Sequence, residues 1–279
     1  MPDDAPLSVR PNPRVQVPVL HDEADFLIVD KPAGMVTQPG KGHATDSLLN
    51  GVFALRDGFV GKLLQNLGVR RDFGLLHRLD RETSGLLVIA KTPNAYDQLR
   101  RDFEDRHVDK EYLAITAGIP KPAQGVVQAR LKEVQVPNAV TGYGSVKKSV
   151  ISRQGQEALT AYRVINRVEE APAALIHLKI KTGRLHQIRA HMMFLNCQVL
   201  GDDLYMPPKE AGLDPKRYPH APRLCLHAAR LGFKLPATGK WVHFESPLPP
   251  DLSAYAQRLG LAAPKPAKEN PAPLAKKKK

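Results

Sequence analysis

The chain has 279 residues, and its hydrophobic fraction of 42% is enough to build the core of one large domain or two small ones. Its formal net charge of +13 favours a polyanionic partner, either nucleic acid or an anionic membrane surface. No apolar run approaches the roughly 20 residues of a membrane helix. The two cysteines stand in separate contexts and indicate neither a disulfide framework nor a zinc cluster.

Both ends of the chain differ in composition from the middle. Residues 1–20 are proline-rich and carry two aspartates near their start, unlike a secretory signal, and we expect a disordered leader and a cytoplasmic protein. Residues 261–279 hold six lysines and one glutamate and have no periodic apolar face, so we expect a disordered basic tail. The terminal lysines either add weak phosphate contacts or only aid solubility.

The first elements are expected between residues 20 and 92. Residues 26–29 read as a short strand, and a Lys-Pro-Ala-Gly turn follows at residues 31–34. Residues 45–55 carry apolar side chains at helical spacing. The apolar run at residues 86–90 has the length and composition of a buried strand.

A charged loop precedes this buried strand. It begins after Gly74 and carries Asp80 between Arg78 and Arg81. Because the loop leads directly into a rigid strand, the carboxylate can be held in a fixed position. Two neighbouring guanidinium groups favour its ionised form. A surface loop of ion pairs is the alternative reading.

The next elements bring further basic residues. Thr92 and Pro93 suit the start of a helix, and the helix carries Arg100 and Arg101. These arginines contact an RNA backbone or form a solvated face. A strand is expected at residues 113–117, just after Tyr112. We expect irregular strands and a loop at residues 118–156, where Lys147, Lys148 and Arg153 are candidate phosphate contacts, and a regular strand again at residues 157–165.

A second motif-bearing stretch lies after residue 174. Residues 175–181 alternate as in a half-buried strand, and residues 186–196 have one apolar helical face. Arg184 and Arg189 are left free to approach another element from the start of that helix. Strands at residues 224–235 and 241–244 and a helix at residues 252–259 complete an α+β pattern.

Two segments carry a resemblance to a known family. HRLDRETSGLLVIAKT at residues 77–92 resembles the catalytic-aspartate signature of RluA-type pseudouridine synthases, and TGRLHQIRAH at residues 182–191 resembles their arginine signature. Leu185 replaces the threonine usual in the second motif. Weaker matches lie at KPAGMVTQPG, at the K-x-Y of Tyr112, at GDDLY and at LHA, so the resemblance spans about residues 21–260.

The resemblance implies a pseudouridine synthase fold, with a mixed, mostly antiparallel central sheet flanked by helices and loops around a basic cleft. It implies one catalytic domain over residues 21–260, acting as a monomer without a cofactor. The expected partner is structured RNA, a stem-loop of ribosomal or transfer RNA, and not a membrane.

The same resemblance assigns roles to individual residues. Asp80 is the nucleophile or the base, Arg189 is its ion-pair partner, and Tyr112 stacks on the uracil. Among the substrate-binding residues, Arg78 enters the space that the flipped nucleotide leaves, and His77 orders the loop. Arg184 and Ile188 are the others, and Ile188 packs either beneath the base or only in the helix core.

Three other readings compete with this one. A metal site at His77, His186 and His191 lacks the usual helical spacing, so no metal is expected. A non-catalytic RNA-binding protein would keep the fold and lose the site. A magnesium-dependent hydrolase would need a second carboxylate near Asp80, for which Glu82 is the only near candidate.

Overall fold

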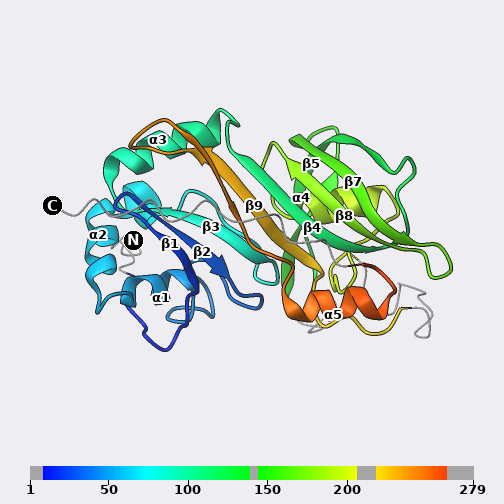
Figure 1. Ribbon diagram of the computed structural model, residues 1–279, viewed down its shortest axis with the longest axis horizontal. Helices are drawn as coiled ribbons and strands as arrows, with labels where there is room; N and C mark the ends of the chain where they lie inside the picture. The colour runs from blue at the N-terminus through cyan, green and yellow to red at the C-terminus, as the bar shows by residue number, and fades with distance from the viewer. Residues whose placement is uncertain (1–8, 139–143, 206–217, 263–279) are drawn as a thin grey trace. The chain divides into compact units, whose positions relative to one another are not determined.

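The computed structural model describes residues 9–138, 144–205 and 218–262, and the chain divides into two compact units (Figure 1). Unit 1 holds the described residues up to Val108 together with Leu231–Ser246. Unit 2 holds the described residues of Asp109–Arg230 and residues 247–262. The boundary falls within strand β9 (Leu226–Lys234), so each unit contains a part of this strand.

Unit 1 combines an antiparallel sheet with short helices. Its strands follow the order β1-β2-β3-β9, with β10 paired to β9. Their bounds are β1 (Val19–Asp22), β2 (Phe26–Lys31), β3 (Ser84–Ala90) and β10 (Trp241–Glu245). The helices are α1 (Leu48–Ala54), α2 (Phe59–Leu67), the 3-10 helix η1 (Val69–Gly74) and α3 (Pro93–Glu104). Thr92 caps α3 as expected, since its hydroxyl accepts a hydrogen bond from the Ala95 backbone N–H at 3.3 Å.

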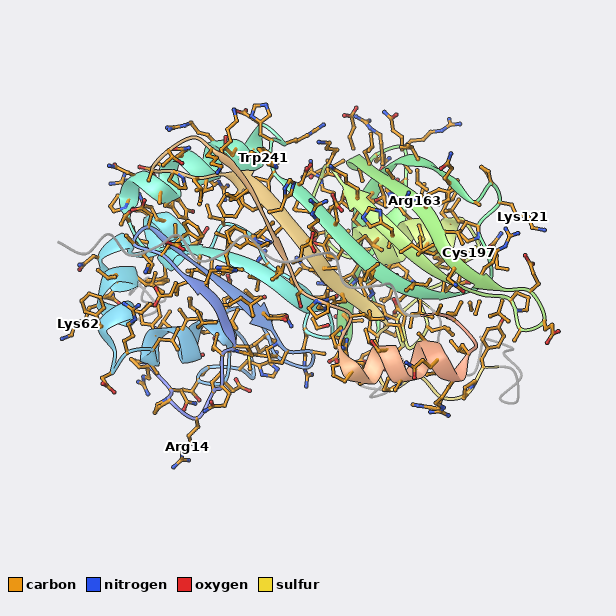
Figure 2. All side chains as sticks on the ribbon, viewed as in Figure 1. Arg14, Lys62, Lys121, Arg163, Cys197 and Trp241 are labelled. Atoms are coloured by element: carbon orange, nitrogen blue, oxygen red, sulfur yellow. The ribbon has the colours of Figure 1, made fainter. Side chains whose placement is uncertain are left out.

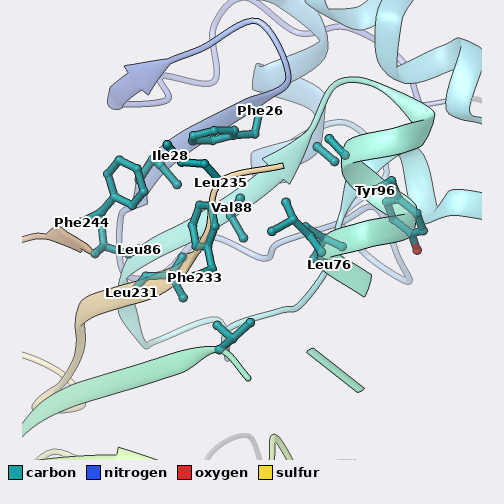
Figure 3. Packing of buried hydrophobic residues seen from close by; sticks show 14 residues of the cluster. Phe26, Ile28, Leu76, Leu86, Val88, Tyr96, Leu231, Phe233, Leu235 and Phe244 are labelled. Atoms are coloured by element: carbon teal, nitrogen blue, oxygen red, sulfur yellow. The ribbon is translucent and has the colours of Figure 1, made fainter. Parts of the chain in front are cut away.

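The core of unit 1 lies on one face of β2 and β3. Alternation along these antiparallel strands places Phe26 and Ile28 beside Val88 (Figure 3). Leu99 of α3 belongs to the same cluster. The rings of Phe233 and Phe244 stack at 5.5 Å in this cluster. Every residue of β3 is buried. This buried strand therefore fixes the C-terminal end of the preceding loop, which carries Asp80.

Part of the expected leader is packed against α1. Val9 is buried, the Arg10 carbonyl accepts a hydrogen bond from Asn50 Nδ2 at 2.7 Å, and the Asn12 N–H donates to the Asn50 carbonyl at 2.9 Å. This part of the expected leader is therefore not disordered, because the side chain and the backbone of the buried Asn50 bind the backbone of Arg10 and Asn12. Residues 1–8, and residues 263–279 of the expected tail, lie outside the described residues.

The helices α2 and η1 are not among the elements expected from the sequence. In α2, Val60, Leu64 and Leu67 are buried at helical spacing, but glycines at its start and within it weaken the local signal. Gly61 is needed by the packing: a Cβ there would lie 2.3 Å from the Phe53 carbonyl oxygen of α1. The close approach of α1 and α2 thus requires a glycine at a helical position where local propensity disfavours it.

Unit 2 is dominated by long antiparallel strands. The order is β9-β4-β8-β7-β5-β6, and the ladders from β4 to β6 are antiparallel. The strands are β4 (Asp109–Ala117), β5 (Gln124–Pro137), β6 (Ser145–Ile151), β7 (Gln156–Val168) and β8 (Ala173–Ile180). Two helices accompany them, α4 (Gln187–Phe194) and α5 (Pro250–Arg258).

The strands expected within residues 118–156 are present, but they are long and regular instead of irregular. β5 and β6 pair in register from Leu131 opposite Ile151 to Pro137 opposite Ser145. Only Val127 and Leu131 of β5 are buried, so apolar alternation is weak although the backbone ladder is regular. Backbone pairing therefore builds a hairpin that side-chain periodicity does not reveal.

The expected α+β fold with a largely antiparallel sheet is confirmed. Each strand and helix expected outside residues 118–156 corresponds to an observed element, with bounds that differ by a few residues. Within the described part of the chain, no helix is both long and apolar enough to cross a membrane.

Candidate active site

The Asp80 loop of unit 1 is anchored by its own apolar residues. Gly74 turns the chain at φ +86°, and Leu75, Leu76 and Leu79 are buried, whereas Arg78 is exposed. The Asp80 carbonyl accepts a hydrogen bond from the Thr83 N–H at 3.1 Å, which closes a turn. The loop is thus fixed on either side of the aspartate by burial and by a local hydrogen bond.

Lys31, the last residue of β2, and Thr37, which follows that strand, fix the backbone on both sides of Asp80. The Thr37 hydroxyl donates to the Leu79 carbonyl at 3.0 Å and accepts from the Leu79 N–H at 3.3 Å. The fully buried Lys31 ammonium donates to the carbonyls of Pro32 and Met35 at 2.8 Å and of Arg81 at 3.0 Å. Lys31 is not among the site residues expected from the sequence; the Lys-Pro-Ala-Gly turn at residues 31–34 is the signal that points to it.

His77 has a structural contact of its own. Its Nε2 accepts a hydrogen bond from the Val88 N–H at 3.3 Å, and its ring stacks on Phe103 at 4.9 Å. An acceptor at Nε2 requires that the neutral ring carries its proton on Nδ1. These contacts tie the loop to β3 and α3.

Tyr112 lies on β4 in unit 2. It is only 8% exposed, and it shares a face of the strand with Lys110, two residues earlier. A Cβ on Gly183 would lie 3.7 Å from Lys110 Nζ, so the ammonium is next to the loop that carries the second motif. Burial, together with the nearby Lys181, lowers the pKa of Lys110 to about 8. Lys110 is therefore a further site candidate, beyond the site residues expected from the motifs.

A buried polar network holds the start of α4. Gln187 Oε1 accepts hydrogen bonds from the Thr182 hydroxyl at 2.6 Å and from the Arg184 N–H at 3.2 Å. Gln187 Nε2 donates to the Thr160 hydroxyl at 3.0 Å, and His191 Nδ1 lies 2.9 Å from the same hydroxyl. The network fixes the turn before α4 without a contribution from a threonine at position 185.

The arginines of the second motif both have partners within unit 2. Arg184 is exposed, and its Nε donates to the Glu157 carbonyl at 3.3 Å. Arg189 is 9% exposed and forms a bidentate pair with Asp202, from Nε to Oδ2 at 2.7 Å and from Nη2 to Oδ1 at 2.8 Å. Both side chains thus contact other segments of unit 2, Glu157 on β7 and Asp202 after α4. Ile188 is buried.

The candidate residues are distributed over the two units. Asp80, Arg78 and His77 belong to unit 1, whereas Tyr112 and Arg189 belong to unit 2 together with Arg184 and Ile188. Asp202 is a further residue that sequence analysis missed, although its GDDLY block was noted. Among the described residues, no cluster of three or more His, Cys, Asp and Glu side chains could hold a metal ion.

Comparisons with known proteins agree with one another. The sequence pattern of the family described as RNA pseudouridylate synthase matches residues 25–193. A protein of Zymomonas mobilis named ribosomal large subunit pseudouridine synthase D is 38% identical over 88% of this chain and 73% of its own length. An uncharacterized RNA pseudouridine synthase of Bacillus subtilis is 32% identical over 93% of this chain and 78% of its own length.

Solved structures show the same fold. The human RNA pseudouridylate synthase domain containing 4 superposes with a TM-score of 0.65 at 28% identity and covers 88% of this chain and 94% of its own. The human RNA pseudouridylate synthase domain containing 1 has a TM-score of 0.61 at 23% identity, covering 91% and 99%. The chain therefore belongs to the RNA pseudouridylate synthase family, of the RluA type, and is an RNA pseudouridine synthase, an isomerase.

Proposed function

We propose that this enzyme isomerises specific uridines in ribosomal or transfer RNA and that Asp80 is its essential carboxylate. The observation that carries this proposal is the way the Asp80 loop is held. Thr37 binds both backbone groups of the preceding residue, and Lys31 binds the carbonyl of the following one. A carboxylate on such a segment is preorganised for a reaction that depends on its position.

The reaction itself conserves all atoms. The bond from ribose C1′ to uracil N1 breaks, the base turns, and C1′ bonds to C5, while C5 loses a proton and N1 gains one. Asp80 attacks the sugar, attacks the base or removes a ribose proton; all three routes use the ionised carboxylate. None of them needs a redox partner, and we propose that the enzyme uses no cofactor.

The other candidate residues complete this proposal. Arg189 pairs with Asp80 during the reaction, and Tyr112 stacks on the uracil after the target nucleotide leaves its RNA stack. Arg78 occupies the vacated space. Arg184 and Ile188 contact the substrate, and His77 keeps the loop in place. A basic cleft receives the RNA.

The most informative target to test first is ribosomal RNA of the large subunit. This choice is supported by the name of relatives such as the Zymomonas mobilis protein, ribosomal large subunit pseudouridine synthase D. A stem-loop of transfer RNA is the other candidate. Both are structured RNAs in which a loop nucleotide can be extruded and recognised.

The experiment is site-resolved mapping of pseudouridine in total RNA from a strain lacking this protein, complemented by variants. We expect the wild-type gene to restore the missing pseudouridine and Asp80→Asn not to restore it. Glu82→Gln, which changes an exposed acid of the same loop, is the matched control and should restore it. Full activity of Asp80→Asn would refute the essential role of Asp80.

We further propose that the enzyme acts as a monomer in the cytoplasm, with one catalytic domain over residues 21–260. Light scattering of the purified full chain tests the oligomeric state, because a dimer would double the mass of 30.8 kDa. Cell fractionation with antibody detection tests the location.

A further inference from the structure

Asp202 is a buried carboxylate whose oxygens are both engaged within unit 2. It is 1% exposed and follows Gly201, at which a Cβ would lie only 1.9 Å from the Arg223 carbonyl oxygen. Oδ1 accepts hydrogen bonds from the backbone N–H groups of Leu204 at 3.0 Å and Tyr205 at 2.9 Å. These backbone hydrogen bonds thus fix the position of the carboxylate independently of its contact with Arg189.

The contact with Arg189 uses one defined edge of the guanidinium. Asp202 binds Nε and Nη2, which form the side edge of this planar group. The end edge, made by Nη1 and the second hydrogen of Nη2, is the one that can meet another anion. A planar guanidinium can therefore bridge two carboxylates, one on each edge.

Tyr205 fixes the plane of the same guanidinium. The Arg189 Cζ atom lies 5.0 Å from the centre of the Tyr205 ring, within the range of a cation–π contact. The Tyr205 hydroxyl is in turn bound to β6: it accepts from the Ser149 N–H at 2.8 Å and donates to the Ser149 carbonyl at 2.9 Å. Asp202 thus determines which edge of the Arg189 guanidinium is occupied, and Tyr205 determines the plane of this group. Both residues lie outside α4.

Stability alone gives a weak reason for such a pair. A buried ion pair costs desolvation that its attraction often fails to repay, and an apolar replacement is often neutral or stabilising. Orientation of a reactive group is the better reason, since a displacement of about 1 Å at an active site can cost about 100-fold in rate.

We propose that Asp202 is a positioning residue, which holds Arg189 so that the end edge of its guanidinium is directed at the reacting carboxylate. This inference rests on the proposed pairing of Arg189 with Asp80. Asp202 does not touch the substrate; it acts through Arg189. The tightly packed turn at Gly201-Asp202 and the ring of Tyr205 hold the Arg189 guanidinium in one orientation.

The test compares Asp202→Asn with Asp203→Asn in single-turnover assays on the mapped target stem-loop. Asn keeps the size of the side chain, but its amide N–H₂ would face a guanidinium donor. We expect kcat to fall about 100-fold while the Kd for the RNA stays within about threefold. Asp203 is exposed, so its variant loses the same charge and should keep wild-type kcat. Thermal unfolding tests whether both variants are folded.

A second variant covers the case in which Asp202→Asn does not fold. Asp202→Glu keeps the charge but carries the carboxylate on a longer side chain, and it should lower kcat while leaving Kd unchanged. Combined with Arg189→Lys, which cannot form the bidentate contact, either folded Asp202 variant should cause little further loss. Additive losses, or wild-type kcat in a folded variant, would overturn the inference. An inactive Asp80→Asn with a fully active Asp202 variant would refute this inference alone, whereas an active Asp80→Asn would refute the proposed function.

Discussion

Tyr112 combines burial with an expected contact to the substrate. Its side chain stands on the face of β4 that also carries Lys110, and its cross-strand neighbour is Leu178 of β8. A tyrosine held between packed strands keeps its ring plane fixed, which favours stacking on a base over a flexible contact. The hydroxyl and the ring can therefore be tested separately.

We expect Tyr112→Ala to lower kcat/KM by about 1–3 kcal/mol, roughly 5- to 150-fold, because base stacking is lost. Tyr112→Phe should keep the stacking and lose only what the hydroxyl contributes. Single-turnover assays on the target stem-loop measure both. Tyr162→Phe, which removes another buried hydroxyl of unit 2, is the control and should retain wild-type kcat/KM. Unchanged kcat/KM in folded Tyr112→Ala would contradict the stacking role.

His191 makes the stability of the fold depend on pH. Its side chain is fully buried next to the Thr160 hydroxyl, and burial lowers the pKa of His191 from 6.5 to about 4. Between these two values the unfolded chain binds a proton that the folded chain does not. The contribution of His191 to stability is therefore fully present above pH 6.5 and is lost progressively down to about pH 4.

We expect this loss to be on the order of 3 kcal/mol and to be absent in His191→Gln, which can still bond to Thr160. Chemical denaturation at pH 7 and pH 4.5 measures the free energy of unfolding of both proteins. The wild type should lose more stability than the variant on acidification. Equal losses in the two proteins would show that His191 is protonated in the folded state.

At the scale of elements, the connection from η1 to the Asp80 loop depends on Gly74. Its φ is +86°, and a Cβ would lie 2.2 Å from the Ala90 carbonyl oxygen at the end of β3. Gly239, between β9 and β10, also has a positive φ of +67°, but its Cβ position has open space. An alanine at Gly239 would therefore introduce backbone strain alone, whereas an alanine at Gly74 would add a steric clash.

We expect Gly239→Ala to cost about 1 kcal/mol of stability from backbone strain, and Gly74→Ala to cost several kcal/mol because β3 must also shift. Since the shift would displace the loop, kcat of folded Gly74→Ala should fall as well. Denaturant unfolding and single-turnover assays test this prediction. Equal costs for the two substitutions would contradict the close packing of η1 against β3.

At the scale of the whole molecule, positive charge is widely distributed. The net charge of +13 is carried by side chains such as Arg14, Lys62 and Arg163, which are exposed and lie in different parts of the chain (Figure 2). Binding of RNA by many such groups releases counterions, and the affinity then falls with salt. The Asp80 carboxylate takes no part in this attraction.

We expect the Kd for the target stem-loop to rise at least about tenfold between 50 and 200 mM salt, with a linear dependence of log Kd on log salt. Asp80→Asn should show the same slope, because the phosphate contacts are unchanged. Fluorescence anisotropy measures both. A Kd that does not respond to salt would contradict an electrostatic contribution to RNA binding.

The sequence was sufficient for the family, the α+β class and most elements, because these follow from local patterns. HRLD before a buried run, alternation in β8 and the Thr92 cap of α3 each need only neighbouring residues. It was not sufficient for β5 and β6, where the backbone ladder pairs strands whose exposed side chains carry little periodicity. Gly61 of α2 is a similar case, since the nearby Phe53 carbonyl of α1, and not local helix propensity, requires a glycine there.

Tertiary structure alone decided the partners of the site residues. Lys31 binds the Arg81 carbonyl 50 residues away, and Asp202 binds Arg189 across the turn that follows α4. The motifs indicated which side chains matter but not what holds them, because a buried polar group takes the partner that folding places within hydrogen-bond distance. That partner is set by register, turn and packing, which no local pattern of residues encodes.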